Sequence, residues 1–206
     1  MNNFLLEKVK EKHLINEIYS YIDWDFLCEY KKLTHDFIRL FSDAVNWKLI
    51  SHYQKLNENF IIEFKNKVDW EIISSEQKLS EKFIRKFKHK VDWWHISIKQ
   101  KLSQNFIREF KDNVRWVFIS IFQKLDEDFI REFIERIDIN QISFHQKISE
   151  NFIRDYHNEV NWEKISLYHD LSEDFIREFQ HKVNWNYIFK SQNLSDEFLI
   201  EFSHKL

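Results

Sequence analysis

The chain has 206 residues, of which 43% are hydrophobic and 32% charged, and its formal net charge is −3 at pH 7. This balance is typical of a soluble chain that buries a core, and it argues against bulk electrostatic attraction to nucleic acid or to an anionic membrane. Glycine and proline are absent from the sequence. The P-loop, the dinucleotide-binding fingerprint and the nucleophile elbow are therefore excluded, because each requires glycine. Cys28 is the single cysteine, so the chain can form no internal disulfide and no cysteine zinc cluster.

Residues 1–32 are expected to form an N-terminal cap that contains a degenerate repeat. The stretch from Met1 to Lys12 does not resemble a signal peptide, and no apolar run approaches the roughly 20 residues of a membrane span. The degenerate repeat can be aligned from Lys10 and is in register at Asp23 and Trp24. We therefore expect no membrane contact and a cytoplasmic location, in the cell that makes the protein or in its host.

From residue 33 onward the sequence repeats every 23 residues without insertion or deletion. Such self-similarity is the signature of a repeat architecture. Seven tandem repeats fill residues 33–193, and a half-repeat over residues 194–206 is expected to cap the C-terminus. Positions within a repeat are numbered 1 to 23, and the consensus is L-S-E-x-F-I-R-E-F-x-x-x-V-D/N-W-x-x-I-S-x-x-Q-K. The first positions are Leu33, Leu56, Leu79, Leu102, Leu125, Ile148, Leu171 and Leu194.

Each repeat carries two helix signals. Position 2 is an N-cap residue, and the apolar positions 5, 6, 9 and 13 fall within about 100° of one another around a helix. This pattern predicts a first helix over positions 3 to 12, which are residues 81–90 in one repeat. Position 14 is a second cap, and positions 15, 18, 19 and 22 share a face, which predicts a second helix of about two turns. Arg115 at position 14 and Ile139 at position 15 depart from the pattern.

Helices this short are marginal alone and become stable by stacking on their neighbours. The sequence therefore predicts an all-α fold, a solenoid of about eight stacked two-helix repeats in one continuous domain. The segment SEDFIREF at residues 172–179, with Asn184, Trp185 and Ile188 after it, illustrates the repeat. Over residues 22–206 these repeats resemble anonymous tandem repeats (SEDFIREF…DWxxIS) of AT-rich bacterial, prophage and giant-virus genomes. The resemblance implies a repeat type and no biochemical activity.

Two recurrent residue types are interpreted as structural, and the histidines are not interpreted as metal ligands. The tryptophan of position 15 is expected to pack where two helices meet, with its N–H on a carbonyl or on the glutamine of position 22, and not to stack on bases. The serine of position 19, which Cys28 replaces, fits a small residue on a buried face. The ten histidines are scattered, without an HExxH pattern or a pair four residues apart. We therefore expect no metal site and no cofactor.

Arginine recurs at position 7, where a stack of repeats displays it in a row. Some helical-repeat proteins read RNA with such rows. Glutamate stands four residues earlier in several repeats, as in the pair Glu81 and Arg85, which favours an ion-paired, solvated face. Binding of RNA stays the alternative hypothesis. Its candidate residues are Arg85, Arg108, Arg131, Arg154 and Arg177.

Positions 16, 17, 20 and 21 point away from the buried face of the second helix and should be polar if they only meet water. In the central repeats they are largely apolar. This stripe is either a surface for a protein partner or part of the packing between repeats. The candidate partner-binding residues are Trp94, Ile98, Val117, Phe118, Ile121, Phe122 and Phe144.

Extended repeat surfaces usually bind other macromolecules. The leading hypothesis is a non-catalytic scaffold for a protein partner, in the form of a virus- or prophage-encoded inhibitor that blocks a host factor such as an immune nuclease. An enzyme is not expected, because no acid–base pair departs from the repeat register. The sequence specifies neither the partner nor the oligomeric state.

Overall fold

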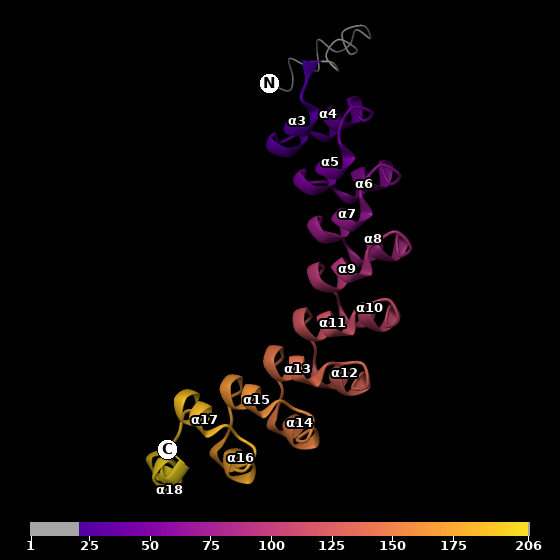
Figure 1. Ribbon diagram of the computed structural model, residues 1–206. Helices are drawn as coiled ribbons and strands as arrows, with labels where there is room; N and C mark the ends of the chain where they lie inside the picture. Colours follow the sequence, from indigo (N-terminus) through magenta and orange to yellow (C-terminus); the bar gives the residue numbers. More distant parts are fainter. Residues whose placement is uncertain (1–20, 206) are drawn as a thin grey trace. The chain divides into compact units, whose positions relative to one another are not determined.

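The computed structural model describes residues 21–205, and this range contains helices and no strand (Figure 1). The predicted all-α fold is confirmed, because successive helices pair in repeats of about 23 residues, as in a helical repeat solenoid. The chain forms two compact units, of which one ends at Gln100 and the other begins at Lys101. The predicted cap before residue 21 and Leu206 lie outside the described residues, and the predicted boundaries at residues 33 and 194 stay predictions.

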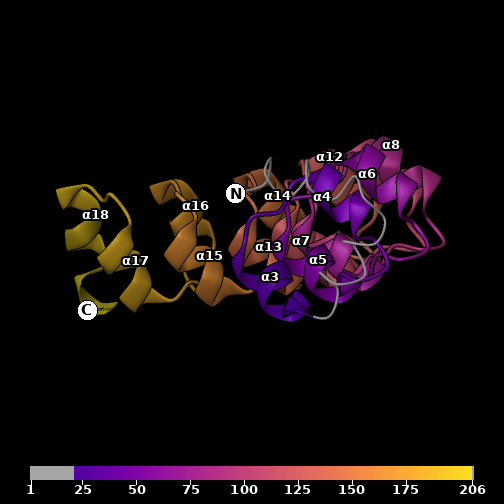
Figure 2. The same ribbon diagram turned by 90° about the horizontal axis from the view of Figure 1, so that it is seen from above.

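The first unit alternates helices of seven and six residues, which form two columns. Figure 1 shows α3, α5, α7 and α9 stacked in one column, with α4, α6 and α8 in a second column beside it, and the view from above separates the same two layers (Figure 2). Within the column, α5 packs on α3 and α7, and α7 packs on α9. The helices are α3 (Trp24–Tyr30), α4 (His35–Leu40), α5 (Trp47–Tyr53), α6 (Glu58–Glu63), α7 (Trp70–Glu76), α8 (Glu81–Lys86) and α9 (Trp93–Lys99).

The second unit repeats the same alternation. Here α13 packs on α11 and α15, and α15 packs on α17. A short 3₁₀ helix, η1 (Ser203–Lys205), follows α18. The other helices are α10 (Gln104–Glu109), α11 (Trp116–Phe122), α12 (Glu127–Glu132), α13 (Ile139–His145), α14 (Glu150–Asp155), α15 (Trp162–Tyr168), α16 (Glu173–Glu178), α17 (Trp185–Ser191) and α18 (Asp196–Glu201).

The first helix of the repeat begins as predicted but is shorter than predicted. In α14 the Ser149 hydroxyl accepts a hydrogen bond from the Phe152 N–H at 3.2 Å, which is the expected N-cap. The helix then ends at position 8 and not at position 12. Tyr156, at position 9, has φ −114° and ψ 28°, outside the helical range. The N–H groups of Glu159 and Val160 both bond to its carbonyl, so the chain turns and still directs Val160 into the core.

The second helix is held at both ends by side chains. In α13 the Asp138 carboxylate accepts from the N–H groups of Asn140 and Gln141, which confirms the predicted cap. The Ser143 hydroxyl donates to the Ile139 carbonyl at 2.8 Å and accepts from the Asn161 N–H at 3.1 Å. Position 19 is therefore small, buried and bonded, and it ties each second helix to the cap of the next one. Arg115 provides no such cap to α11.

The tryptophan of position 15 packs between successive repeats. The Trp162 ring is half-buried, with its centroid 4.9 Å from the Phe179 ring and 6.2 Å from the Phe175 ring. Its Nε1–H donates to the His157 carbonyl at 2.9 Å. Of the two predicted acceptors, the backbone carbonyl is therefore the one used, and the glutamine of position 22 is not. The Lys182 ammonium lies over the ring, 6.0 Å from its centroid. The indole is therefore a packing element and not a free stacking platform.

The glutamine of position 22 joins each repeat to the preceding one. Gln146 is buried, its Oε1 accepts from the Leu125 N–H at 3.1 Å, and its Nε2 donates to the carbonyls of Ser120 and Gln123 at 3.0 and 2.8 Å. These carbonyls belong to the C-terminal end of α11, where helices leave acceptors without an internal partner. The same pattern holds for Gln77 and Gln192. No buried polar side-chain atom of the described residues lacks a hydrogen-bond partner.

His169 replaces this glutamine in one repeat and should make the fold sensitive to acid. Burial lowers the pKa of His169 below its ordinary 6.5, and hydrogen bonds to the backbone of Ser143 and Ile148 and the charge of Asp170 oppose that effect. The imidazole of His169 therefore takes up a proton more readily in the unfolded chain than in the folded chain. The His169 contribution to stability is therefore complete above about pH 6.5 and is lost as the pH falls below it.

We expect the variant His169→Gln to lose less stability on acidification than the native chain. The measurement is denaturant unfolding of both chains at about pH 7.5 and about pH 5.5. Because the other histidines are common to both proteins, the difference between them isolates position 169. Equal losses of stability in the two chains would contradict the assignment.

Candidate partner-binding face

The second helix of each repeat turns one face to its neighbours and the other outward. In α11, Ile119 and Ser120 at positions 18 and 19 are fully buried, on the inner face. At about 100° per residue, positions 16, 17, 20 and 21 lie on the opposite side of the helix. The capped, hydrogen-bonded inner face fixes the helix, and the outer positions are left to vary between repeats.

In the first unit, two of the predicted partner-binding residues lie on α9. Trp94 is 46% exposed and Ile98 is half-buried. The Trp94 ring centroid lies 4.7 Å from that of His95, nearly edge-on. His95 is itself fixed, because its Nδ1 lies 2.9 Å from the Asp92 carboxylate. One large exposed ring therefore stands beside an oriented imidazole on this helix.

In the second unit, the other five predicted residues lie on α11 and α13. Val117, Phe122 and Phe144 are 50%, 54% and 40% exposed, whereas Phe118 and Ile121 are half-buried. The ring centroids of Phe118 and Phe122 are 6.3 Å apart. The sequence of α11, WVFISIF, contains no charged residue. We call this set the apolar face: Val117, Phe118, Ile121, Phe122 and Phe144.

An open groove of about 540 Å³ adjoins the apolar face, between the C-terminal ends of α11 and α13. Ile121 and Phe122 line it, together with Gln123 and Gln146, two of the buried glutamines of position 22, which we call the glutamine ladder. The exposed Lys124 and Lys147, both at position 23, contribute its cationic groups, and His145 is also part of the lining. This lining contains no aspartate or glutamate.

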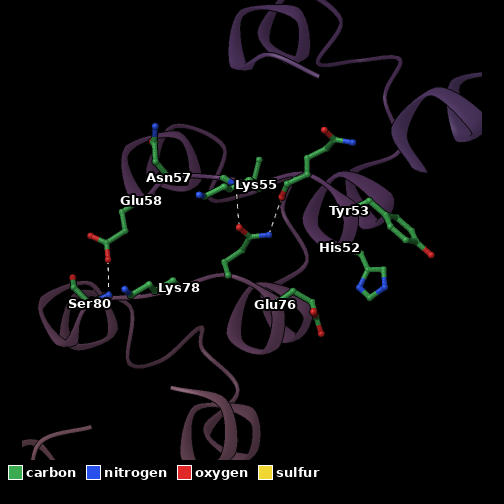
Figure 3. Close-up of a pocket in the computed structure, with 11 residues that line it drawn as sticks. His52, Tyr53, Lys55, Asn57, Glu58, Glu76, Lys78 and Ser80 are labelled. Carbon is green, nitrogen blue, oxygen red and sulfur yellow. Dashed lines mark hydrogen bonds between the residues drawn. The ribbon is translucent and has the colours of Figure 1, made fainter. Parts of the chain in front are cut away.

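A groove at the same register in the first unit has a different charge pattern. It lies between the ends of α5 and α7, has a volume of about 710 Å³, and is lined by residues that include Tyr53, Lys55 and Lys78 (Figure 3). Glu58 and Glu76 also line it, and Glu58 accepts a hydrogen bond from the Ser80 N–H at 2.6 Å (Figure 3). Carboxylates therefore accompany the lysines in this groove, unlike in the groove beside the apolar face.

Sequence reasoning missed the lysines of position 23 as site residues, although the consensus displays them. The apolar face also continues beyond the predicted residues. Phe144 lies 4.7 Å from Tyr168 between ring centroids, and Tyr168 is exposed on α15. The Lys164 ammonium lies 5.3 and 5.9 Å from these two ring centroids. The sequence indicates this extension, because Leu167 and Tyr168 are apolar residues at positions 20 and 21 of the next repeat.

The arginines of position 7 are engaged in contacts between successive repeats. The Arg154 guanidinium donates to Glu178, at position 8 of the next repeat, at 2.8 Å and lies 5.0 Å from the Phe175 ring centroid. The corresponding pairs are Arg39 with Glu63, Arg108 with Glu132, Arg131 with Asp155, and Arg177 with Glu201, at 2.7 to 2.9 Å. The predicted pairs four residues apart within a helix are longer, as for Arg85 and Glu81 at 3.8 Å and Arg154 and Glu150 at 3.7 Å. This geometry favours an ion-paired row over a row of free phosphate contacts.

Nucleophiles and metal ligands do not gather into a reactive centre in the described part of the chain. Cys28 is fully buried, and burial raises the pKa of its thiol, which makes it a poor nucleophile. Across residues 21–205, no group of three or more histidine, cysteine, aspartate or glutamate side chains is placed to hold a metal ion. Every helix in that range is too short or too polar to traverse a bilayer.

No family model, curated protein or solved structure matches this chain. Function is therefore inferred from the described residues themselves. Two features stand out from the repeat pattern: the apolar face on α11 and α13, and the exposed Trp94 on α9.

Proposed function

We propose that the protein is a non-catalytic helical-repeat scaffold that binds a protein partner through the apolar face. The observation that carries the proposal is the outer side of α11, where Val117 and Phe122 are half exposed on a helix without a charged residue. Contiguous exposed apolar side chains with aromatic rings among them are typical of the buried centre of a protein interface. Trp94 offers a comparable anchor on the first unit.

The same side chains contribute little to the recurrent packing of the repeat. Ile119 and Ser120 form the buried inner side of α11, and the positions of Val117 and Phe122 are occupied by Asn140 and His145 in the next repeat. Polar residues at equivalent positions support the interpretation that the fold does not require an apolar outer side. The apolar residues of α11 therefore suit binding better than stacking.

The other two hypotheses about function have less support than this one. Binding of RNA by the arginine row stays a prediction, and the ion pairs of Arg108, Arg131 and Arg154 with the following repeat make it the weaker of the two. An inhibitor that blocks a host factor also stays a prediction. It is one form that a non-catalytic scaffold takes, because occupying a partner's surface requires no chemistry.

The proposal predicts that Phe122→Ala weakens partner binding by more than about 2 kcal/mol, as truncation of a central aromatic anchor does. The chain and its variant are immobilised and exposed to a lysate of the source cells or of their host, and the retained proteins are identified by mass spectrometry. A protein retained by the native chain should be lost or strongly reduced with the variant. Its affinity for both chains is then measured with the purified partner.

A control variant separates this face from the rest of the surface. Arg154→Ala changes a partly exposed, ion-paired residue on α14 and should leave partner binding unchanged. If Phe122→Ala retains every protein that the native chain retains, with equal affinity, the apolar face is not the binding site. If Arg154→Ala abolishes binding and Phe122→Ala does not, the arginine row is the binding site instead of the apolar face.

A further inference from the structure

The lysines of position 23 differ from the arginines of position 7 in having no ionic partner. Among the residues that the structure describes, neither Lys124 nor Lys147 forms an ion pair with a carboxylate. Two of the acidic side chains that follow Lys124 are already engaged in hydrogen bonds. Asp126 caps α12, and both carboxylate oxygens of Glu127 accept hydrogen bonds from Ser149. Two exposed ammonium groups therefore lie beside the apolar face without an ion pair to a described carboxylate.

Charge and shape together define what this groove can hold. Its lining combines Lys124, Lys147 and His145 with the apolar Ile121 and Phe122, and it includes no acidic residue. An anionic group is attracted by the two ammonium groups, and an apolar side chain is desolvated against Phe122. A ligand that satisfies both parts carries a carboxylate close to a large apolar side chain.

We propose that the groove between α11 and α13 binds an acidic segment of the protein partner, with aspartate or glutamate next to leucine or an aromatic residue. The inference rests on the proposed function and specifies the chemistry of its partner. A peptide is favoured over a single-stranded nucleic acid because the chain carries a net charge of −3 and the groove offers only two lysines, whereas affinity for nucleic acid depends on many contacts to phosphates. The apolar side chain rests on Phe122, and the carboxylates meet Lys124 and Lys147.

The test begins with a random peptide library displayed on phage and selected on the immobilised full chain. Enriched peptides should combine acidic residues with leucine, phenylalanine or tryptophan. A selected peptide, labelled with a fluorophore, is then titrated by anisotropy. The double variant Lys124→Glu/Lys147→Glu should weaken its affinity by about tenfold or more. A peptide whose acidic residues are changed to lysine should recover affinity for this variant, because the charges are then exchanged.

A matched control lies at the same register of the first unit. The double variant Lys55→Glu/Lys78→Glu changes two lysines of the groove that also contains Glu58 and Glu76, and it should leave the affinity within about twofold. Circular dichroism of both variants should equal that of the native chain, because all four lysines are exposed.

The remaining outcomes overturn the inference in distinguishable ways. Enriched peptides without acidic residues, or an equal loss of affinity in the control variant, would refute the assignment of this groove and leave the scaffold function intact. A single-stranded oligouridylate whose binding is lost in Lys124→Glu/Lys147→Glu would assign the lysines to nucleic acid. If no peptide is enriched above the bare support, the inference is overturned, whereas the proposed function is contradicted only if Phe122→Ala retains every protein that the native chain retains.

Discussion

Replacing Gln146 by leucine should lower the free energy of unfolding by roughly 3 kcal/mol or more. Leucine fills much of the same space but makes none of the three hydrogen bonds that Gln146 makes. The Leu125 N–H and the carbonyls of Ser120 and Gln123 would then be left without this partner. Each buried, unsatisfied group costs about 1–3 kcal/mol. The measurement is denaturant unfolding followed by circular dichroism.

The chain supplies a matched control for this substitution. His169 occupies the same position in another repeat, with its Nε2 2.8 Å from the Ser143 carbonyl. Gln146→His should therefore retain part of the bonding and lose less stability than Gln146→Leu at neutral pH. If the leucine variant is as stable as the native chain, the glutamine ladder is not what joins the repeats.

Replacing Trp162 by alanine should cost about 3 kcal/mol of unfolding free energy. The value lies at the low end for a large aromatic residue because the ring is half-buried. The loss combines the contacts with Phe175 and Phe179 and the hydrogen bond to the His157 carbonyl. Because each repeat is stabilised by stacking on its neighbours, the effect should appear as a lower denaturation midpoint.

Isoleucine at this position is the control, because Ile139 occupies it naturally in the preceding repeat. Trp162→Ile should lose less stability than Trp162→Ala, since a branched side chain still fills part of the space against the phenylalanines. If Trp162→Ala is as stable as the native chain, the packing role of the Trp162 ring is contradicted, and the ring must serve another function.

Much of the fold could be predicted because the repeat displays its caps and its apolar face many times. Ser149 and Asp138 mark the beginnings of two helices, and both accept the expected backbone hydrogen bonds. The end of the first helix could not be predicted. The turn after Tyr156 keeps Val160 on the buried side, and a helix that continued to this residue would do the same. The spacing of the apolar residues therefore cannot distinguish the turn from a longer helix.

Contacts between repeats are harder to predict from the sequence than contacts within one helix. Spacing along one helix predicts the pair Glu173 and Arg177, which is present at 3.6 Å. The shorter contact of Arg177 is with Glu201 at 2.9 Å, one repeat later. The identity of that partner depends on how far one repeat is displaced from the next, and this displacement cannot be read from the sequence. The bonds of the glutamine ladder were missed for the same reason.

For the candidate site, the sequence predicted the outer side of the helix but not the degree of exposure. Positions 16 and 21 of α11 are open, at Val117 and Phe122, whereas positions 17 and 20, at Phe118 and Ile121, are half covered. The angle around a single helix cannot separate these pairs, because the covering atoms belong to neighbouring helices. The charge pattern of the groove, with Lys124 and Lys147 and no acidic residue, likewise emerges only when two repeats are placed side by side.

The claim that the outer side of α11 serves binding and not packing is tested most directly by the free energy of unfolding of Val117→Ser/Phe122→Ser. Surface substitutions away from structural contacts usually change stability by at most about 0.5 kcal/mol each. The account predicts a total change of at most about 1 kcal/mol, with unaltered helicity. A loss of about 3 kcal/mol or more, equal to that of Gln146→Leu, would contradict it and would assign Val117 and Phe122 to the packing between repeats.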